Sequence, residues 1–307
     1  TKDRKRCAKD TFFKKGGRKM EYEPLSTLVE LLCRGNAMHI SVWDFSGLLQ
    51  WEPLRVDLAN QFHSVPFCGL AKSTRKGYRL CIRCKERANR KARVGKVPFS
   101  GYCVCGLFEA AYPVVLDGQV RCVVYAGNLA PDLPAAEERL RRTAGITGAP
   151  AERMAEELRA GEHSLTPEDA ERAARLVGSY IRLLGRDAPW PVSPRHWAVE
   201  RLLEAVREHY AYPITLRDLA AVCYFNEKYA GRLFKAQTGQ NFHQYLAAYR
   251  LDRAEEMLRE GSRAVADVAR ECGFESTSYF NRLFRERFGR SPGAYRKETG
   301  FSSENLV

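Results

Sequence analysis

Five cysteines lie between positions 68 and 105 of this 307-residue chain, at spacings that suit a metal site. Cys81 and Cys84 form a Cys-x-x-Cys pair, whose two thiolates can reach one metal ion. Cys68 and a cysteine further along the chain supply the remaining thiols. We therefore predict a site formed by Cys68, Cys81, Cys84 and Cys103 (or Cys105), holding zinc or an iron–sulfur cluster.

Two other interpretations of these thiols stay open. The spacing matches no standard zinc-finger or ferredoxin pattern, and the many Lys and Arg residues nearby would stabilise thiolates, which favours a redox-active or ligand-reactive site. The thiols can also be small apolar residues of a core. Because the N-terminus has no apolar signal segment, ten cysteines indicate a protein of the reducing cytoplasm.

A second set of chemically suited residues occurs twice near the C-terminus. Residues 232–239 read RLFKAQTG, and residues 282–289 read RLFRERFG. Each stretch belongs to a short helix, a tight turn and a longer helix, the helix-turn-helix pattern that places its second helix in the major groove of DNA. Small, polar and basic side chains on that second helix suit base edges and phosphates. We predict DNA contacts from Lys228, Gly231, Arg232, Lys235, Ser276, Thr277, Ser278, Asn281, Arg282 and Arg285.

The segment between the two copies sets their separation. A helix predicted over 243–260 is about 27 Å long at ~1.5 Å per residue. Successive major-groove faces lie about 34 Å apart, so this helix can hold two recognition helices in adjacent grooves. Ala230 and Gly231 make the first recognition helix small at its centre, so we expect the second to contribute more of the specificity.

The elements that position these groups form two blocks. Three prolines in RDAPWPVSPR indicate a linker at 186–195. The first block has an α+β pattern, with a β-rich run at 38–45 and a hairpin at 109–127 around Asp117-Gly118. The second block is all α. The predicted domains are a basic tail (1–19), a sensor domain (20–185), the linker, a DNA-binding domain (196–299) and a tail (300–307). Helices of the first block are expected near 22–34, 54–64, 79–94, 134–144, 151–160 and 167–184.

The net charge of +13 is unevenly spread. Residues 75–96 carry ten Lys and Arg against one Glu, whereas residues 196–299 carry 17 basic against 14 acidic residues. The DNA-binding prediction therefore rests on local geometry rather than on overall charge. An RNA-binding or chromatin-like protein that uses the basic segments is one alternative. With no run of 18 apolar residues, we expect no membrane span.

The second block closely resembles the AraC/XylS family of transcription regulators over about 196–297. The resemblance is carried by residues that include Leu219-Ala220, Arg232 to Lys235, Gly239, Arg250, Gly273-Phe274, Ser278 to Phe280, Phe288-Gly289 and Ser291-Pro292. It implies two helix-turn-helix motifs that bind double-stranded DNA, usually to activate transcription. The expected partners are DNA, RNA polymerase, a small-molecule effector and a second copy of the chain, the last through helices such as 167–184.

The first block looks like the sensory domain of PocR over about 20–184. The likeness lies in Cys68, the Cys81–Cys84 pair at the start of a basic helix, Cys103 followed by Gly106-Leu107, and the Asp-Gly hairpin. The resemblance implies a PAS-like fold that senses small organic molecules such as diols. Aromatic residues that could line an effector pocket are Trp43, Trp51, Phe67, Tyr102, Phe108 and Tyr112.

Together these observations predict a ligand-responsive, sequence-specific DNA-binding regulator of the cytoplasm, and not an enzyme. A redox- or metal-sensing regulator is one alternative. Another is a DNA-repair methyltransferase in which a nucleophilic cysteine of a zinc domain, joined to a similar helix-turn-helix block, accepts a methyl group. The cysteine spacing lacks the compact pattern expected of that enzyme.

Overall fold

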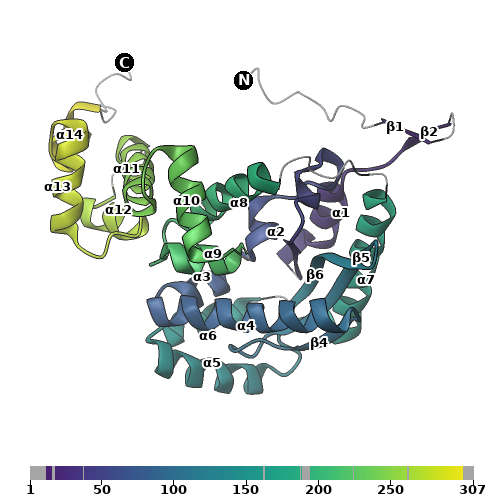
Figure 1. Ribbon diagram of the computed structural model, residues 1–307. Helices are drawn as coiled ribbons and strands as arrows, with labels where there is room; N and C mark the ends of the chain where they lie inside the picture. Colours follow the sequence, from purple (N-terminus) through teal and green to yellow (C-terminus); the bar gives the residue numbers. More distant parts are fainter. Residues whose placement is uncertain are drawn as a thin grey trace, which may run out of the picture. The chain divides into compact units, whose positions relative to one another are not determined.

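The computed structural model describes residues 12–15, 18–36, 38–161, 163–186, 188, 194–223, 225–260 and 263–299 (Figure 1). Within these residues the chain forms two units. The first comprises the described residues up to Ala71 and Leu80–Ala198, and the second comprises Lys72–Arg79 and the described residues from Val199 onward. The segment 72–79 thus belongs to the unit of the C-terminal helices, a grouping that the linear domain prediction did not contain. Most of the predicted linker lies outside the described residues.

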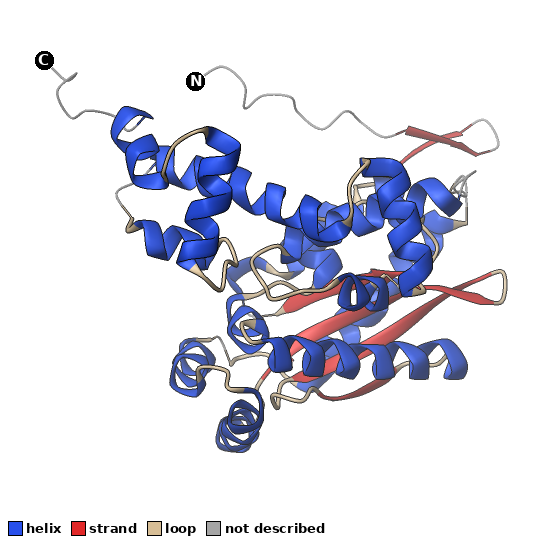
Figure 2. Ribbon diagram, turned by 60° about the vertical axis from the view of Figure 1, so that its left-hand side comes forward, coloured by secondary structure: helices blue, strands red, loops and turns tan. Residues whose placement is uncertain are grey.

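The first unit is built on a four-stranded antiparallel sheet (Figure 2, red). The strands run in the order β3-β6-β5-β4. Their bounds are β3 His39–Asp44, β4 Phe99–Tyr102, β5 Phe108–Leu116 and β6 Gln119–Leu129. The helices are α1 Leu25–Leu32, α2 Leu58–Phe62, α3 Pro66–Lys72, α4 Arg75–Gly95, α5 Leu133–Thr147, α6 Ala151–Ala160 and α7 Pro167–Gly185. Short 3-10 turns span Arg34–Asn36, Leu48–Gln50 and Glu52–Leu54, and β1 Phe12–Lys15 pairs with β2 Arg18–Glu21 as a separate hairpin. The α+β prediction is confirmed, and the PAS-like fold stays a prediction.

The predicted Asp-Gly hairpin joins β5 to β6. Leu116 pairs with Gln119, which leaves Asp117 and Gly118 as a two-residue turn. Both have positive φ, 50° and 71°, as the tightest hairpin turns require. Asp and Gly tolerate this conformation better than most residues, so the turn fixes the strand register locally.

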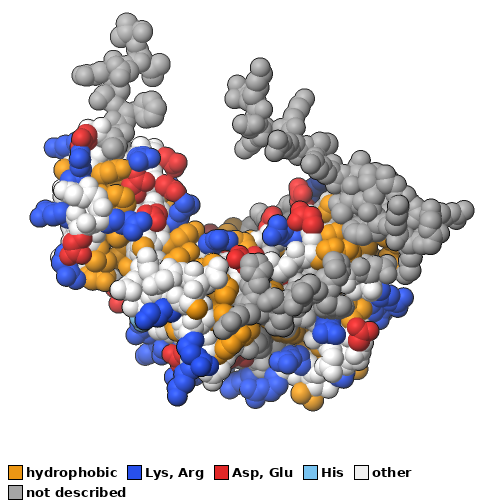
Figure 3. Space-filling model, turned by 45° about the horizontal axis from the view of Figure 1, so that its top comes forward, with side chains coloured by type: hydrophobic (Ala, Val, Ile, Leu, Met, Phe, Trp, Pro, Cys, Tyr) orange, Lys and Arg blue, Asp and Glu red, His pale blue; other side chains and the backbone are white. Residues whose placement is uncertain are grey.

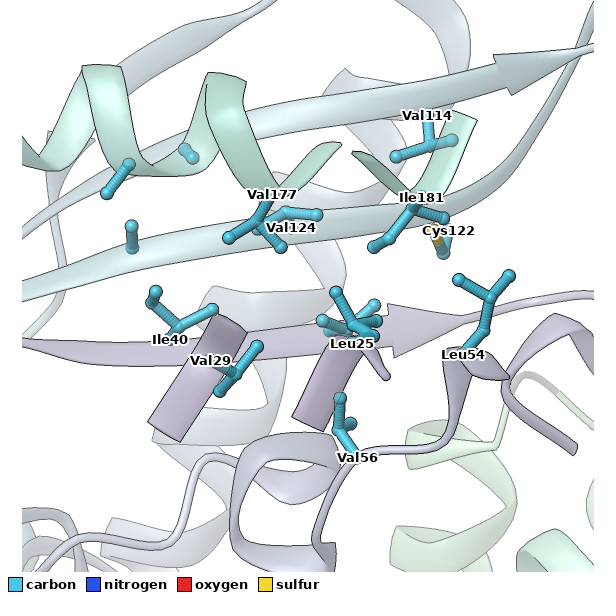
Figure 4. Packing of buried hydrophobic residues seen from close by; sticks show 14 of the residues in the cluster. Leu25, Val29, Ile40, Leu54, Val56, Val114, Cys122, Val124, Val177 and Ile181 are labelled. Atoms are coloured by element: carbon cyan, nitrogen blue, oxygen red, sulfur yellow. The ribbon is translucent and has the colours of Figure 1, made fainter. Parts of the chain in front are cut away.

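The sheet is covered on both faces. On one face, alternate residues of β5 and β6 pack against α7 and α1, as Figure 4 shows for Val124 beside Val177 and Cys122 beside Ile181. Gly178 permits this close packing, because a Cβ there would lie 2.2 Å from Cδ1 of Tyr112. On the other face, α4 meets the sheet through polar groups. The Tyr125 hydroxyl donates to Asn89 Oδ1 at 2.6 Å, and Lys85 Nζ lies 2.9 Å from the carboxylate of Glu109.

A β-bulge interrupts the pairing of β5 with β6 at the end nearest α3. Phe108 pairs with Leu129 and Glu109 with Gly127, so Asn128 has no partner in the register. Asn128 has φ 68°, in the left-handed region that few residues other than Gly and Asn adopt. A Cβ on Gly127 would lie 2.3 Å from the carbonyl oxygen of Phe108, so the strands can approach this closely only at a glycine. Bulges of this kind redirect side chains and are common beside functional sites.

The second unit is helical. Its elements are α8 Pro194–His209, which begins in the first unit, α9 Leu216–Val222, α10 Glu227–Thr238, α11 Phe242–Glu260, α12 Val265–Glu271, α13 Thr277–Phe288 and α14 Pro292–Thr299. The pairs α9–α10 and α12–α13 are the two predicted helix-turn-helix copies. Helix α9 starts with a capping box, in which Thr215 Oγ1 accepts from Asp218 N while Asp218 Oδ2 accepts from Thr215 N.

Arg250 of α11 connects the two copies. Its Nε and Nη2 donate to the carbonyl oxygens of Tyr210 and Tyr212, both at 2.8 Å. Gly273, in the turn of the second copy, has φ 83°, and a Cβ there would lie 2.8 Å from the carbonyl oxygen of Ala211. The turn at 210–212 is thus held by α11 on one side and by the second copy on the other. Burial lowers the pKa of Arg250 to about 10, so the guanidinium stays charged at neutral pH.

The segment 72–79 packs into the same unit. The buried Tyr78 hydroxyl lies 2.8 Å from His209 Nδ1, and the Tyr78 and Tyr212 ring centroids are 5.9 Å apart. Arg79 Nε lies 3.4 Å from Oδ1 of Asp218, the third residue of α9 and a member of its capping box. The start of α4 therefore contributes to the core of the second unit. None of the helices in the described ranges is long and apolar enough to cross a membrane.

Candidate nucleic-acid interface and sensory pocket

Helices α10 and α13 each bury one face and expose the other. Helix α10 buries Ala230, Leu233 and Phe234, and α13 buries Phe280 and Phe284. The predicted DNA contacts lie on the opposite faces. Exposed are Lys228, Arg232, Lys235, Ser276, Thr277, Ser278, Asn281, Arg282 and Arg285, and Gly231 is half-buried. The structure thus places the predicted residues on two comparable outward surfaces.

The centre of α10 differs from the sequence-based expectation in one respect. Ala230 is fully buried and faces the core, so it does not make the outward face small. Only Gly231 does so, and a Cβ there would lie 3.2 Å from Leu216 Cδ2. The glycine therefore also allows α9 and α10 to pack closely. Glycine at position 231 can thus be explained by helix packing as well as by DNA recognition.

The start of each recognition helix is capped by a side chain. Asn226 Oδ1 accepts from Lys228 N at 2.9 Å, and Ser276 Oγ accepts from Tyr279 N at 3.2 Å. Because Ser276 Oγ accepts this capping bond, its role in the structure is first of all that of a cap. Capping leaves the N-terminal turn of α13, with Thr277 and Ser278, exposed on the surface.

Helix α11 spaces the two copies (Figure 1). It has 19 residues, Phe242–Glu260, one more than predicted, which is about 28 Å at ~1.5 Å per residue. Beside the second copy, Leu251, Ala254 and Leu258 of α11 share a core with Phe280 and Phe284. The helix thus packs as a rigid rod rather than as a loose connection.

Two exposed tyrosines repeat at the same step of the recognition helices. Tyr229 is 36% exposed and Tyr279 46% exposed, and the Arg282 guanidinium lies 5.4 Å from the Tyr279 ring centroid. Neither was among the DNA contacts predicted from the sequence. Their identity in both copies was the available signal, because an exposed aromatic residue retained twice on an outward face suggests a contact. On the visible face of the C-terminal helices, Lys and Arg mix with Asp and Glu (Figure 3), as the near balance of charge predicts.

The clustered thiols of the first unit come from three segments. Cys68 lies on α3, Cys81 and Cys84 lie on α4, and Cys103 and Cys105 lie in the turn that follows β4. In that turn Gly106 N donates to the Cys103 carbonyl at 3.0 Å. Cys68 and Cys105 are buried in a small core with α5 and α6. These two cysteines therefore also fill space, as the core interpretation holds.

The clustered thiols shift one another's pKa values. The thiol of Cys105 donates to Cys103, which lowers the pKa of Cys103. The same hydrogen bond, burial and the charges of Cys103, Cys81 and Cys68 raise the pKa of Cys105. Burial and the nearby Cys103 raise the pKa of Cys84. Even so, no group of three or more His, Cys, Asp or Glu side chains in the described part of the chain is arranged to hold a metal ion. The thiols do not fit a metal as they stand, and the metal site stays a prediction.

A buried polar cluster that sequence reasoning missed lies between the sheet, α2 and α4. His63 Nε2 lies 3.3 Å from Glu109 Oε1 and 3.2 Å from Asn128 Oδ1. Lys85 Nζ lies 2.9 Å from both carboxylate oxygens of Glu109 and 3.7 Å from the centroid of the Tyr125 ring. His63, like Asn128, has positive φ (55°). Two residues in a rare backbone conformation at one cluster are typical of a functional site.

A cavity of 250 Å³ adjoins this cluster. Its apolar wall includes Met38, Val65, Phe67, Leu107 and Leu158, and its polar lining includes His39, Asn128, Glu157 and His163. Of the aromatic residues predicted to line a pocket, Phe67 lies on this wall. Trp43 is buried at 3% exposure, Trp51 and Phe108 belong to the main core, and Tyr102 is 52% exposed. Tyr112 lies on the α7 side of the sheet, so the six do not surround one cavity among those described.

Two family matches agree with these two surfaces. Residues 56–188 match a family described as the sensory domain found in PocR. Residues 219–298 match a helix-turn-helix domain family of the AraC type. The first match includes α2 to α7 with the polar cluster and most of the residues that line the cavity, and the second includes α10 and α13.

Curated relatives carry the names of regulators rather than of enzymes. The transcriptional activator RhaR of Pectobacterium atrosepticum is 36% identical over 99 residues, covering 32% of this chain and 35% of that protein. The regulatory protein PocR of Salmonella typhimurium is 30% identical over 111 residues, covering 36% of this chain and 37% of that protein. The chain thus spans only about a third of the length of these relatives.

One solved structure, the DNA-binding domain of AdpA in complex with a target DNA, is 30% identical and covers 33% of this chain and 91% of that chain, with a TM-score of 0.32. Each of the two family matches falls largely within one of the two blocks. This chain therefore combines a sensory domain of the PocR family with a helix-turn-helix domain of the AraC type.

Proposed function

We propose that this protein is a sequence-specific DNA-binding transcription regulator whose activity responds to a small organic effector held by the first unit. The observation that carries the proposal is the repeat of two outward helical faces, α10 and α13, on one rigid α11. Both faces present polar and basic side chains of the kind that reads base edges and phosphates. The named relatives, an activator and a regulatory protein, support a role in transcription, with activation the direction we favour.

The experiment that tests DNA binding compares base contacts with phosphate contacts on α13. Asn281→Ala and Arg282→Ala should each weaken binding to a specific duplex by roughly 1–3 kcal/mol while changing binding to random DNA much less. Arg285→Ala should weaken both and reduce the dependence of affinity on salt. Arg270→Ala, an exposed Arg of α12 paired with Asp267, is the matched control. Equal losses for Asn281→Ala and Arg270→Ala would contradict the assignment of the interface.

Helix α7 supports the proposal of a homodimer. Leu176 and Leu183 are 52% and 47% exposed, although they lie on a helix whose other face is fully packed. They are seven residues apart and so share one side of the helix. A second copy of α7 is the occupant we propose for this side. Leu176→Glu/Leu183→Glu should shift the mass measured by sedimentation from dimer to monomer, and a monomeric wild-type chain would refute it.

A further inference from the structure

We propose that the cavity beside Asn128 is the effector site of the first unit, and that it takes a small uncharged molecule with an apolar body and an oxygen acceptor. This inference rests on the proposed function and deepens it, because it names the site and the class of effector. The cavity, at 250 Å³, is smaller than the ~300–1,000 Å³ typical of drug-sized ligands, so its occupant is small.

The hydrogen-bonding capacity of Asn128 follows from its neighbours. A carboxylate accepts only, so His63 Nε2, 3.3 Å from Glu109 Oε1, carries a proton and donates. The same N–H points to Asn128 Oδ1 at 3.2 Å, which fixes that atom as the amide oxygen. Asn128 Nδ2 therefore has two N–H donors, and Cys68 Sγ, at 3.9 Å, can take one of them. The other is available to an acceptor oxygen in the cavity, which Asn128 lines.

The backbone holds Asn128 in this position at a cost. The bulge removes Asn128 from the strand register and places it in the left-handed region, next to a glycine that no larger residue can replace without a clash. A positive φ at a residue other than glycine is unfavourable, and the surrounding structure must maintain it. A regular β5–β6 pairing would have avoided this cost, so the bulge is best explained by the need to present the amide to the cavity.

The charges of the cluster favour a neutral occupant. Lys85 is buried, but its ammonium group is already paired with both oxygens of Glu109. The buried charges therefore balance and leave no net charge for an ionic ligand. Glu157, the lining residue with a full charge, is exposed and lies at the rim. A carboxylate or ammonium group placed in the cavity would lose its hydration without gaining a buried counter-charge.

The same contacts connect the cavity to α4. Glu109 is shared between His63, which also binds Asn128, and Lys85, which belongs to α4. A ligand that binds the Asn128 amide alters the hydrogen bond between Asn128 and His63. Because His63 also contacts Glu109, it thereby alters the Glu109–Lys85 pair. Helix α4 is continuous from Arg75, in the second unit, to Gly95, in the first. A change at Lys85 thus acts on a helix whose first residues are part of the DNA-binding unit.

The test uses three probes with one carbon skeleton: butyramide, butyrate and butylamine. Each is added to the full-length protein without DNA at matched ionic strength, and the Tm is measured as a function of probe concentration. Butyramide should raise the Tm progressively, with a logarithmic dependence on its concentration above the Kd, because a ligand that binds only the folded state stabilises it by mass action. The two charged probes should raise it much less.

Two variants locate the binding. Asn128→Gly removes the amide at a position whose φ glycine tolerates, and Ala160→Phe fills the mouth of the cavity from the exposed end of α6. Both should lose the response to butyramide, whereas Ser100→Ala, on the exposed strand β4, should keep it. A larger shift with butyrate or butylamine, a response that survives in both variants, or no shift with any probe would each overturn the proposal. The Tm assay contains no DNA, so its outcome does not depend on DNA binding. If the wild-type chain failed to bind DNA, that result would count against the proposed function instead.

Discussion

Lys85 of α4 and Glu109 of β5 form a buried ion pair, with Nζ 2.9 Å from each carboxylate oxygen and the two side chains 7% and 13% exposed. The ammonium group also lies over the ring of Tyr125, and the carboxylate also contacts His63. The pair thus joins α4 to the sheet and connects, through His63, to Asn128 in the wall of the cavity. Its burial makes it sensitive to the loss of either partner.

The first prediction concerns this pair. Lys85→Met and Glu109→Gln should each lower the free energy of unfolding by about 3–5 kcal/mol, because each leaves one buried group without its partner. The double variant Lys85→Met/Glu109→Gln should lose much less than the sum of the single losses. Urea denaturation of the four proteins measures this coupling. Arg142→Met, which breaks an exposed pair with Glu138, should cost less than about 1 kcal/mol. Additive losses at 85 and 109 would show that the pair is not coupled.

The second prediction concerns the bulge. Gly127→Ala should destabilise the protein by about 1–3 kcal/mol or more, because the added Cβ meets the Phe108 carbonyl oxygen at 2.3 Å and backbone must move. Gly145→Ala is the matched control. Gly145 lies inside α5, where a Cβ meets nothing within 4 Å, so alanine should be neutral or stabilising by about 0.5–1 kcal/mol. If both variants unfold at the same urea concentration, the close approach of β5 and β6 is not a constraint.

The third prediction concerns the joint between the two helix-turn-helix copies. Arg250→Met should cost about 1–3 kcal/mol for each carbonyl oxygen of Tyr210 and Tyr212 left without its donor. It should also weaken binding to a duplex with two half-sites more than binding to a duplex with one, because the copies lose their fixed separation. Arg259→Met, at an exposed position of the same helix, should change neither quantity by more than about 1 kcal/mol. If Arg250→Met lowers the free energy of unfolding but leaves the ratio of the two duplex affinities unchanged, Arg250 does not fix the separation of the two copies.

The fourth prediction concerns the thiols. Protein purified without oxygen should hold zinc or iron, and Cys81→Ser/Cys84→Ser should lose it, if side-chain rotation brings the clustered thiols together on a metal. Elemental analysis and a visible spectrum measure both. Cys223→Ser is the control, since burial raises the pKa of that thiol to about 12 and it belongs to the second unit, whereas the clustered thiols belong to the first. Metal-free protein with every thiol titratable after unfolding would leave these cysteines as core residues.

Local patterns predicted much of the fold. The Asp117-Gly118 turn and the helix predicted near 167–184 are encoded within short stretches, and the structure confirms both. The outward faces of α10 and α13 followed from the repeat, because helical periodicity separates buried from exposed positions without knowledge of the rest of the fold.

Local sequence patterns could not predict the cavity or its polar cluster. His63 follows α2, whereas Lys85, Glu109 and Asn128 lie on α4, β5 and β6, so tertiary packing brings the four together. A lone His, Lys or Asn in the sequence gives no sign of its neighbours. The expected aromatic pocket failed for the same reason: Phe108 faces the main core because of its place in the strand alternation, whereas Glu109, the next residue, faces the cluster. The joining of 72–79 to the second unit is likewise a long-range contact without a local signal.

The measurement that tests the central claim most directly is the selection of bound duplexes from a random pool by the full-length protein, followed by footprinting of the selected site. Two helices on one rigid α11 should yield two preferred sequence blocks about 10–10.5 bp apart on one face of the duplex. Asn281→Ala should relax the preference in only one of the blocks. A single block, or a pool without any enriched sequence, would contradict a regulator that reads two successive turns of DNA.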